Sequence, residues 1–386
     1  MSSSEDEPLV AAVQAPPLNI PSGATVSVKI IDTTTTIKVP LSLQMGPKIM
    51  GHDDLFCPAY SFLIEHPSGR KLLYDLGTRK DLENLSPSIV GMMSAPGWHF
   101  TVEKDVAEIL EANATSTGSI EAVIWSHWHF DHIGNMETFP SSVNLIVGPG
   151  FKSGLLPGYP TNKDSHLLES DWAGRELVEL EFDARSKLGQ FKAIDYFDDG
   201  SFYLLDAPGH AIGHVCGLAR VSKGTGGEED TFVFMGGDTC HHGGQWRPNQ
   251  YLPLPKQVFP TKPILGRSVC PGSVFQKLHR HNSAVEEYYR MAPNFPQDYQ
   301  EAEKTIHHMQ EFDAAKNILV IIAHDCAPLE PNSGFKFFPN GTLNDWKRDK
   351  LDRRIRWTFL EDFLPAIEQG AQQETTMEAG LTFRPR

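Results

Sequence analysis

The chain lacks the features that mark membrane and secreted proteins. It contains no run of about 18 apolar residues, so no segment is expected to span a bilayer. Its first residues, MSSSEDEPLV, are acidic, whereas a secretory signal peptide needs a basic start and a longer apolar run. The sequence therefore predicts a cytoplasmic protein with no membrane partner.

Cysteine is scarce, and basic charge is not concentrated anywhere. The 5 cysteines are scattered and show no C-x-x-C spacing, which argues against a disulfide framework and is typical of reduced thiols in the cytosol. Asp and Glu number 49 against 34 Lys and Arg, a formal net charge of -15. Because such a surface repels phosphate backbones, we expect no nucleic-acid partner.

What the chain does have is a globular composition. Of its 386 residues, 40% are hydrophobic, and 22 Phe and 7 Trp can fill a sizeable core. Residues 1–22, rich in Ser, Glu and Pro, are expected to form a flexible tail, and residues 23–386 a single domain. Residues 243–296 are rich in Pro and aromatics and match no regular element.

Short apolar runs bounded by turn residues predict many strands and few helices. Pro67-Ser68-Gly69-Arg70 is turn chemistry between two such runs and predicts a hairpin. The order of elements predicts a layered α+β or α/β architecture in which two sheets pack together and helices cover the outside. Strands are expected at 24–31, 35–40, 60–66, 71–77, 121–125, 143–148, 202–207, 215–221, 231–237 and 318–323, and helices at about 102–113, 297–315 and 349–369.

Potential metal ligands are concentrated directly after the apolar strand at 121–125. The segment His127-Trp128-His129-Phe130-Asp131-His132 offers three imidazoles and a carboxylate. Zinc prefers these ligands at about 2.0–2.2 Å, and a catalytic zinc keeps one position open for water. The cluster therefore predicts a catalytic metal site.

Two metals close together need more ligands than this cluster supplies. The strand at 202–207 is followed by Pro208-Gly209-His210, where glycine lets the backbone turn sharply. Asp238 follows the strand at 231–237, and His324 follows the strand at 318–323. We therefore predict that His210, Asp238 and His324 converge on the cluster at 127–132.

This pattern resembles the metallo-β-lactamase superfamily, whose signature is H-x-H-x-D-H followed by a distant His, a bridging Asp and a last His. The resemblance covers roughly 24–330 and includes Asp75, which matches the family's early structural Asp. It implies an αββα four-layer sandwich with two zinc ions (Zn2+) per chain at one edge of the sheets. It also implies the ligands: His127, His129 and His210 for the first ion, Asp131, His132 and His324 for the second, and Asp238 bridging both.

The phrase APGHAIGH at 207–214 most resembles the N-acyl homoserine lactonase branch, and two features depart from it. The 86 positions from Asp238 to His324 are many for a compact lactonase, so residues 243–296 are expected to be an insert that forms a lid or pocket wall. Three residues after Asp238, where that branch often has Tyr, the chain has His241. The insert is similar to that of fungal members that open lactam or lactone rings.

The resemblance implies a hydrolase that opens a cyclic ester or amide of a small molecule with a zinc-activated hydroxide. Asp131 is expected to pass a proton to the leaving group, and His241 to donate a hydrogen bond to the carbonyl. Two other functions are alternatives: a di-iron or mononuclear iron enzyme and a non-catalytic binding protein. The sequence does not decide between a monomer and a homodimer. A further alternative is a thioester hydrolase of the hydroxyacyl-glutathione hydrolase type, for which the available basic residues are Lys347, Arg348, Lys350, Arg353 and Arg354.

Overall fold

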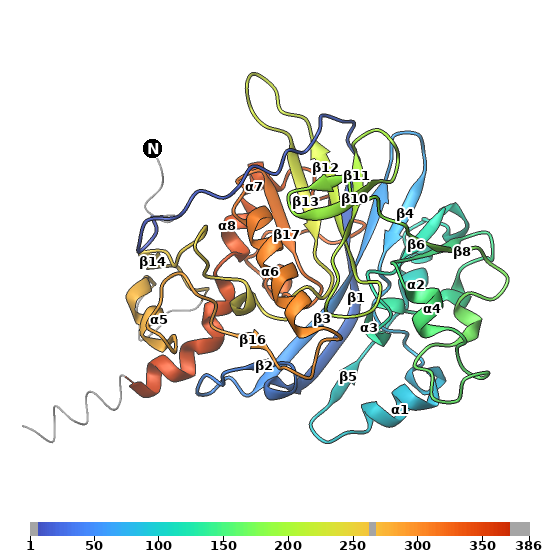
Figure 1. The fold of residues 1–386 in the computed structure, drawn as a ribbon, viewed down its shortest axis with the longest axis horizontal. Helices are drawn as coiled ribbons and strands as arrows, with labels where there is room; N and C mark the ends of the chain where they lie inside the picture. The colour runs from blue at the N-terminus through green and yellow to red at the C-terminus, as the bar shows by residue number, and fades with distance from the viewer. Residues whose placement is uncertain (1–6, 262–267, 371–386) are drawn as a thin grey trace, which may run out of the picture.

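Two β-sheets packed face to face form the centre of the molecule, which a computed structural model describes over residues 7–261 and 268–370 (Figure 1). In spatial order, the first sheet consists of β5 (His99–Thr101), β1 (Ser27–Pro40), β3 (Asp54–Glu65), β4 (Lys71–Tyr74), β6 (Ala122–Ile124), β7 (Asn144–Val147) and β8 (Leu177–Glu179). The second consists of β17 (Ile318–Ile321), β13 (Thr231–Met235), β12 (Val215–Ser222), β11 (Phe202–Asp206), β10 (Phe191–Asp195) and β9 (Lys187–Leu188).

The sheets hold together through apolar side chains that alternate along their inner faces. Ile30 and Phe62 of the first sheet pack in one buried cluster with Leu204, Val233 and other residues of the second. Burying each such side chain contributes roughly 1.5–3 kcal/mol relative to leaving it in water. The predicted hairpin is present, because β3 and β4 pair antiparallel across the turn at 67–70.

Helices cover both outer faces of the sandwich (Figure 1). Helix α2 (Val106–Ala112) places Leu110 against the first sheet, and α6 (Tyr299–Asp313) places Met309 against the second. The layer order α, β, β, α confirms the predicted sandwich. The other named α-helices are α1 (Pro87–Met93), α3 (Phe130–Ile133), α4 (Phe151–Leu155), α5 (Gly272–Leu278), α7 (Trp346–Asp349) and α8 (Leu351–Ile355), and no described helix is long and apolar enough to cross a membrane.

Two secondary-structure expectations were wrong in detail. The strands expected at 24–31 and 35–40 are one strand, β1, whose register shifts between Asp32 and Thr36. The single helix expected at 349–369 is divided into shorter pieces: left-handed Lys350 (φ 56°) separates α7 from α8, and α8 itself ends at Ile355. A 3-10 helix, η9 (Thr358–Phe363), follows α8.

The predicted tail and insert lie together in the structure. Glu7 and Leu9 bond through their backbones to Lys256 and Leu254, and Val13 bonds to Gln250. The Ser-rich and Pro-rich composition of the tail did not indicate these contacts, because their partners lie far along the chain. Residues 1–6 and 262–267 lie outside the described residues. The insert also contains β14 (Gln257–Val258), β15 (Cys270–Pro271) and β16 (Arg290–Met291), and β16 pairs with β2 (Met45–Gly46).

The topology brings several strand ends to one edge of the sandwich. Strands β13 and β17 are parallel, and β11 runs in the same direction because β12 pairs antiparallel with both β11 and β13. In the first sheet, β4, β6, β7 and β8 are parallel. Side chains that follow β6, β11, β13 and β17 can therefore meet at this edge.

Candidate metal centre

The segment after β6 supplies four of the seven predicted ligands. The chain bends at residues 126–129 after β6, so His127 lies just beyond the strand end, and α3 then places Asp131 and His132 near it. The backbone N–H of His132 donates to the carbonyl of His129 (3.0 Å), which holds this tight turn. The four side chains of this segment therefore lie close together beyond the end of β6.

The other three ligands follow strands of the second sheet. His210 follows β11, Asp238 follows β13, and His324 follows β17. Gly209, which precedes His210, has a φ of 122° and lies against the first turn of α6, where a Cβ would overlap the backbone of Ala302. Glycine is therefore required for His210 to face the centre.

Three imidazoles and one carboxylate oxygen form the first group. His210 Nε2 lies 3.2 Å from His127 Nε2 and 3.0 Å from His129 Nδ1. Asp238 Oδ2 lies 3.5 Å from His210 Nε2. Ring nitrogens gathered this closely around a carboxylate are typical of ligands that share one cation.

The second group shares Asp238 with the first. Asp238 Oδ1 lies 3.1 Å from both His132 Nε2 and His324 Nε2. Asp131 Oδ2 lies 3.5 Å from His324 Nε2. Asp238 Oδ2 also lies 3.2 Å from His324 Nε2, so the carboxylate of Asp238 contacts both groups, as expected of a bridging ligand.

The donor atoms fit divalent metal ions better than they fit one another. His132 Nε2 and Asp238 Oδ1 are buried and have no hydrogen-bond partner, although they lie 3.1 Å apart. A buried polar atom without a partner costs about 1–3 kcal/mol, so an ion between these atoms would remove a penalty. Imidazole and carboxylate are also the ligands that zinc prefers.

Hydrogen bonds behind the centre fix which ring nitrogen of each histidine faces it. His132 Nδ1 donates to Asp75 Oδ2 (2.8 Å), and His324 Nδ1 donates to the carbonyl of Pro58 (2.7 Å). Both rings therefore turn Nε2 toward the centre, as metal-bound histidines do. His214 acts on the backbone instead, because its Nδ1 donates to Ala207 (2.9 Å) and its Nε2 accepts from the N–H of Asp238 (3.0 Å).

Replacing Asp75 by Asn is expected to lower metal affinity by about 10–100-fold, because the amide N–H would force the ring proton of His132 onto Nε2. Metal content after dialysis against a graded chelator measures this change. Asp199→Asn is the matched control, since Asp199 accepts from His66 (2.8 Å) far from the centre. Equal metal retention in both variants would remove Asp75 from this role.

Burial and charge act in opposite directions on the histidines. Burial lowers the pKa of His129 to about 4, so the ring is neutral and its lone pair is free near neutral pH. Burial also acts to lower the pKa of His132, but the carboxylates of Asp238, Asp131 and Asp75 outweigh it and raise this pKa well above its usual value. A cation at the centre would take the place of the proton that these carboxylates favour on His132.

An apolar cavity of about 180 Å³ opens onto the centre. Its walls include Trp98, Trp128, Phe130 and Phe295, beside Asp131. Phe295 belongs to the insert, so the insert contributes to the wall of this cavity. The aromatic side chains of five other residues pack in apolar clusters: Phe100, Trp246, Phe275, Tyr288 and Tyr289. His166 also lines the cavity, and no sequence pattern pointed to it.

His241 lies within the centre rather than beside it. Its Nε2 is 3.1 Å from Asp238 Oδ2, and its Nδ1 is buried without a hydrogen-bond partner. A protonated Nδ1 would be a buried donor with no acceptor, so the ring proton is favoured on Nε2, facing the centre. The structure thus brings all seven predicted ligands and His241 together.

Comparison with known proteins gives consistent matches. A sequence model of the metallo-beta-lactamase superfamily matches residues 54–150. The chain is 42% identical over 376 residues to metallo-hydrolase mfmC of Annulohypoxylon moriforme, covering 95% of this chain and 96% of that protein. It is 41% identical over 370 residues to gamma-lactamase FDB1 of Fusarium pseudograminearum, covering 92% and 86%.

A solved structure shares the fold at low sequence identity. A variant of AiiA from B. thuringiensis, with N-decanoyl-L-homoserine bound at its active site, superposes with a TM-score of 0.53 and 15% identity. The match covers 82% of this chain and 99% of that chain. The two-sheet architecture described above is therefore found in a known enzyme fold.

Proposed function

Because the chain belongs to the metallo-beta-lactamase superfamily and is a metal-dependent hydrolase, we propose that it opens the ring of a small cyclic amide or ester, and that a lactam is preferred. The observation that carries the proposal is the pair of ligand groups sharing Asp238 beside an apolar cavity. A lactam is favoured over a lactone because FDB1, 41% identical over most of its length, is named a gamma-lactamase.

We propose zinc at both groups, with the ligands that the sequence predicts. When bound, two such ions would lower the pKa of a water molecule toward neutrality and polarise the substrate carbonyl. The cavity walls supply apolar surface for the rest of the substrate and keep bulk water from it. Its volume of about 180 Å³ favours a small ring over a long chain.

Asp131 has the position needed to move a proton. Its carboxylate lines the cavity and lies 3.5 Å from His324 Nε2, so it adjoins both the substrate space and the second ligand group. Opening a lactam forms a carbon–oxygen bond and breaks a carbon–nitrogen bond, and the leaving nitrogen must gain a proton. Asp131 would take that proton from the attacking water and deliver it to the nitrogen.

His241→Ala is expected to lower kcat by about 10-fold to 100-fold while metal content stays unchanged, since the variant loses an Nε2–H donor to the developing oxyanion. Turnover and metal content measured on the same preparation test this. His281→Ala is the control, because His281 bonds to Glu286 (2.7 Å) rather than to Asp238. Unchanged turnover in His241→Ala would remove His241 from the mechanism.

The thioester alternative is less well supported. Lys350, Arg353 and Arg354 line a separate cavity with Trp357, and none of the metal-centre residues borders that cavity. Arg348 forms ion pairs with Asp345 and Asp349. These basic residues would have to bind a carrier at a distance from the reacting carbonyl.

A hydrolysis panel on metal-loaded protein separates these functions. Matched lactams, lactones and thioesters of similar size would be compared by the acid released at constant pH. We expect the highest kcat/KM for a small lactam. Turnover confined to thioesters would favour the alternative, and no turnover with any substrate would contradict the proposal.

A further inference from the structure

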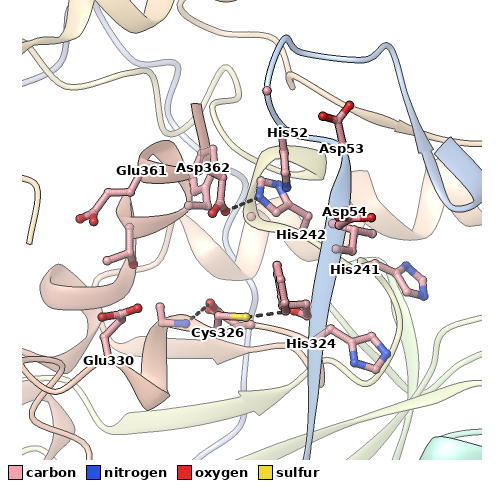
Figure 2. Close-up of a pocket in the computed structure, with 18 of the residues that line it drawn as sticks. His52, Asp53, Asp54, His241, His242, His324, Cys326, Glu330, Glu361 and Asp362 are labelled. Carbon is pink, nitrogen blue, oxygen red and sulfur yellow. Dashed lines mark hydrogen bonds and ion pairs between the residues drawn. The ribbon is translucent and has the colours of Figure 1, made fainter. Parts of the chain in front are cut away.

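A second cluster of ligating side chains lies in a larger cavity next to the metal centre. This cavity, about 440 Å³, has His241 and His324 at one side and His52, His242 and Asp362 at another (Figure 2). The candidate donor atoms of His52, His242 and Asp362 lie within 4.8 Å of one another. Two ligands of one ion, each about 2.0–2.2 Å from it, lie at most about 4.4 Å apart. The 4.8 Å limit exceeds this span by a few tenths of an ångström, so a small side-chain rotation would bring two of these donor atoms to the spacing of a shared ion.

The hydrogen bonds assign different roles to the two histidines. His242 Nδ1 accepts from the backbone N–H of Gly244 (3.0 Å), so the ring proton sits on Nε2 and is donated to Asp362 Oδ2 (3.0 Å). His242 therefore orients the carboxylate of Asp362 and is not itself free to bind metal. A carboxylate held in this way is typical of a metal ligand with a supporting outer partner.

One ring nitrogen of His52 has a hydrogen-bond partner, and none is found for the other among the described residues. Its Nδ1 lies 2.7 Å from the hydroxyl of Tyr289, which fixes the ring, and its side chain lies against that of His242 with ring centroids 5.0 Å apart. Burial is the largest cause that lowers the pKa of His52 to about 4. The ring is therefore neutral near neutral pH, as a metal ligand must be.

The charge of the cavity also favours a cation. Among the residues that the structure describes, no Lys or Arg lines its walls. Lys38 neutralises Asp54 and Lys48 neutralises Asp53, but no ion pair of Asp325 or Glu330 with a basic residue is found among the described residues. The carboxylates in the wall are Asp53, Asp54, Asp325, Glu330, Glu361 and Asp362 (Figure 2).

We propose that His52 and Asp362 bind a third divalent transition-metal ion, with His242 and Tyr289 positioning these two ligands. Mixed imidazole and carboxylate donors suit zinc, cobalt or manganese. With two protein ligands the site is weaker than the main centre, and solvent fills the remaining positions. The ion would lie in the same cavity as His241 and His324, on the side away from the apolar walls.

The histidine cluster around His279 provides a contrast, because backbone groups use the ring nitrogens of His279. His279 Nδ1 accepts from the N–H groups of His281 and Ser283 (both 3.2 Å), and its Nε2 donates to the carbonyl of Glu287 (2.9 Å). Both ring nitrogens are thus used by the backbone, although His281 and Glu286 lie near enough to complete a metal site. His281→Ala is therefore a suitable control.

Titration of the full-length protein with Zn2+ and Co2+ tests the third site. Isothermal calorimetry counts the ions, and the absorption spectrum of bound Co2+ reports its ligands. Wild type is expected to bind one more equivalent than His52→Ala or Asp362→Asn, whereas His281→Ala matches wild type. Positioning by His242 predicts that His242→Phe weakens this equivalent by about 10–100-fold.

The comparison is a difference between variants, so it does not depend on how many ions the main centre holds. Circular dichroism establishes that each variant is folded, and Asp362, half exposed, is the substitution that disturbs packing least. Equal stoichiometry in wild type, His52→Ala and Asp362→Asn would overturn the proposal. Loss of the extra equivalent only in His281→Ala would overturn it as well.

Discussion

Asp131→Asn is expected to lower kcat by about 100-fold to 10,000-fold with little loss of metal. The size follows from the usual contribution of a positioned acid or base. Asn keeps an oxygen in the place of the carboxylate, so the 3.5 Å approach to His324 Nε2 can be retained, but the amide cannot accept and return a proton. Steady-state kinetics and metal analysis on one preparation measure the two quantities separately.

A second carboxylate provides the comparison for this experiment. Asp54 lines the neighbouring cavity and pairs with Lys38 (2.8 Å), so Asp54→Asn changes the local charge without touching the ligand groups. We expect its kcat to stay close to wild type. If Asp131→Asn loses metal and turnover in equal measure, Asp131 is a ligand without a separate role in proton transfer.

Gly209→Ala is expected to destabilise the protein by on the order of 3 kcal/mol or more and to abolish metal binding at the first group. The new Cβ would overlap the backbone of Ala302 and lie 2.6 Å from the carbonyl carbon of Glu301. Backbone hydrogen bonds hold the start of α6 against this segment. The N–H of Asp298 donates to the carbonyl of Gly209 (2.8 Å), and the N–H of Gln297 donates to the carbonyl of His210 (2.9 Å). Relieving the overlap would therefore move His210 away from the centre.

Gly69→Ala separates the strain of the backbone angle from the overlap. Gly69 has a φ of 92°, and a Cβ there would meet nothing within 4 Å. Chemical denaturation of both variants should give a small loss for Gly69→Ala and a much larger one for Gly209→Ala. Similar losses would mean that the left-handed angle, and not the contact with α6, explains the glycine.

The sequence was informative about the metal centre because each ligand follows a strongly apolar strand. Strands β6, β11, β13 and β17 were all expected, and parallel strands end at the same edge. The ligand positions could thus be predicted without knowing any distance. The roles of Asp131 and His241 stay predictions until the kinetic experiments are done.

The second cluster could not be predicted, because nothing local marks it. His52 lies in the turn before β3, His242 follows β13, and Asp362 lies in η9, within the segment expected as one continuous helix. Their approach depends on how the carboxyl-terminal segment folds back over the cavity. The α-helix expected there ends at Ile355, and helix propensity alone did not indicate the change to the 3-10 helix η9 that contains Asp362.

The ligands of the centre come from both sheets, since His127 follows a strand of the first sheet and Asp238 and His324 follow strands of the second. An ion bound there would act as a cross-link between the two halves of the sandwich, and its binding free energy would add to the stability of the whole fold. Loss of the metal would then lower the stability of the fold as well as the activity. It would loosen the sandwich along one edge and expose the chain to proteases, so that metal supply would set how long each molecule lasts.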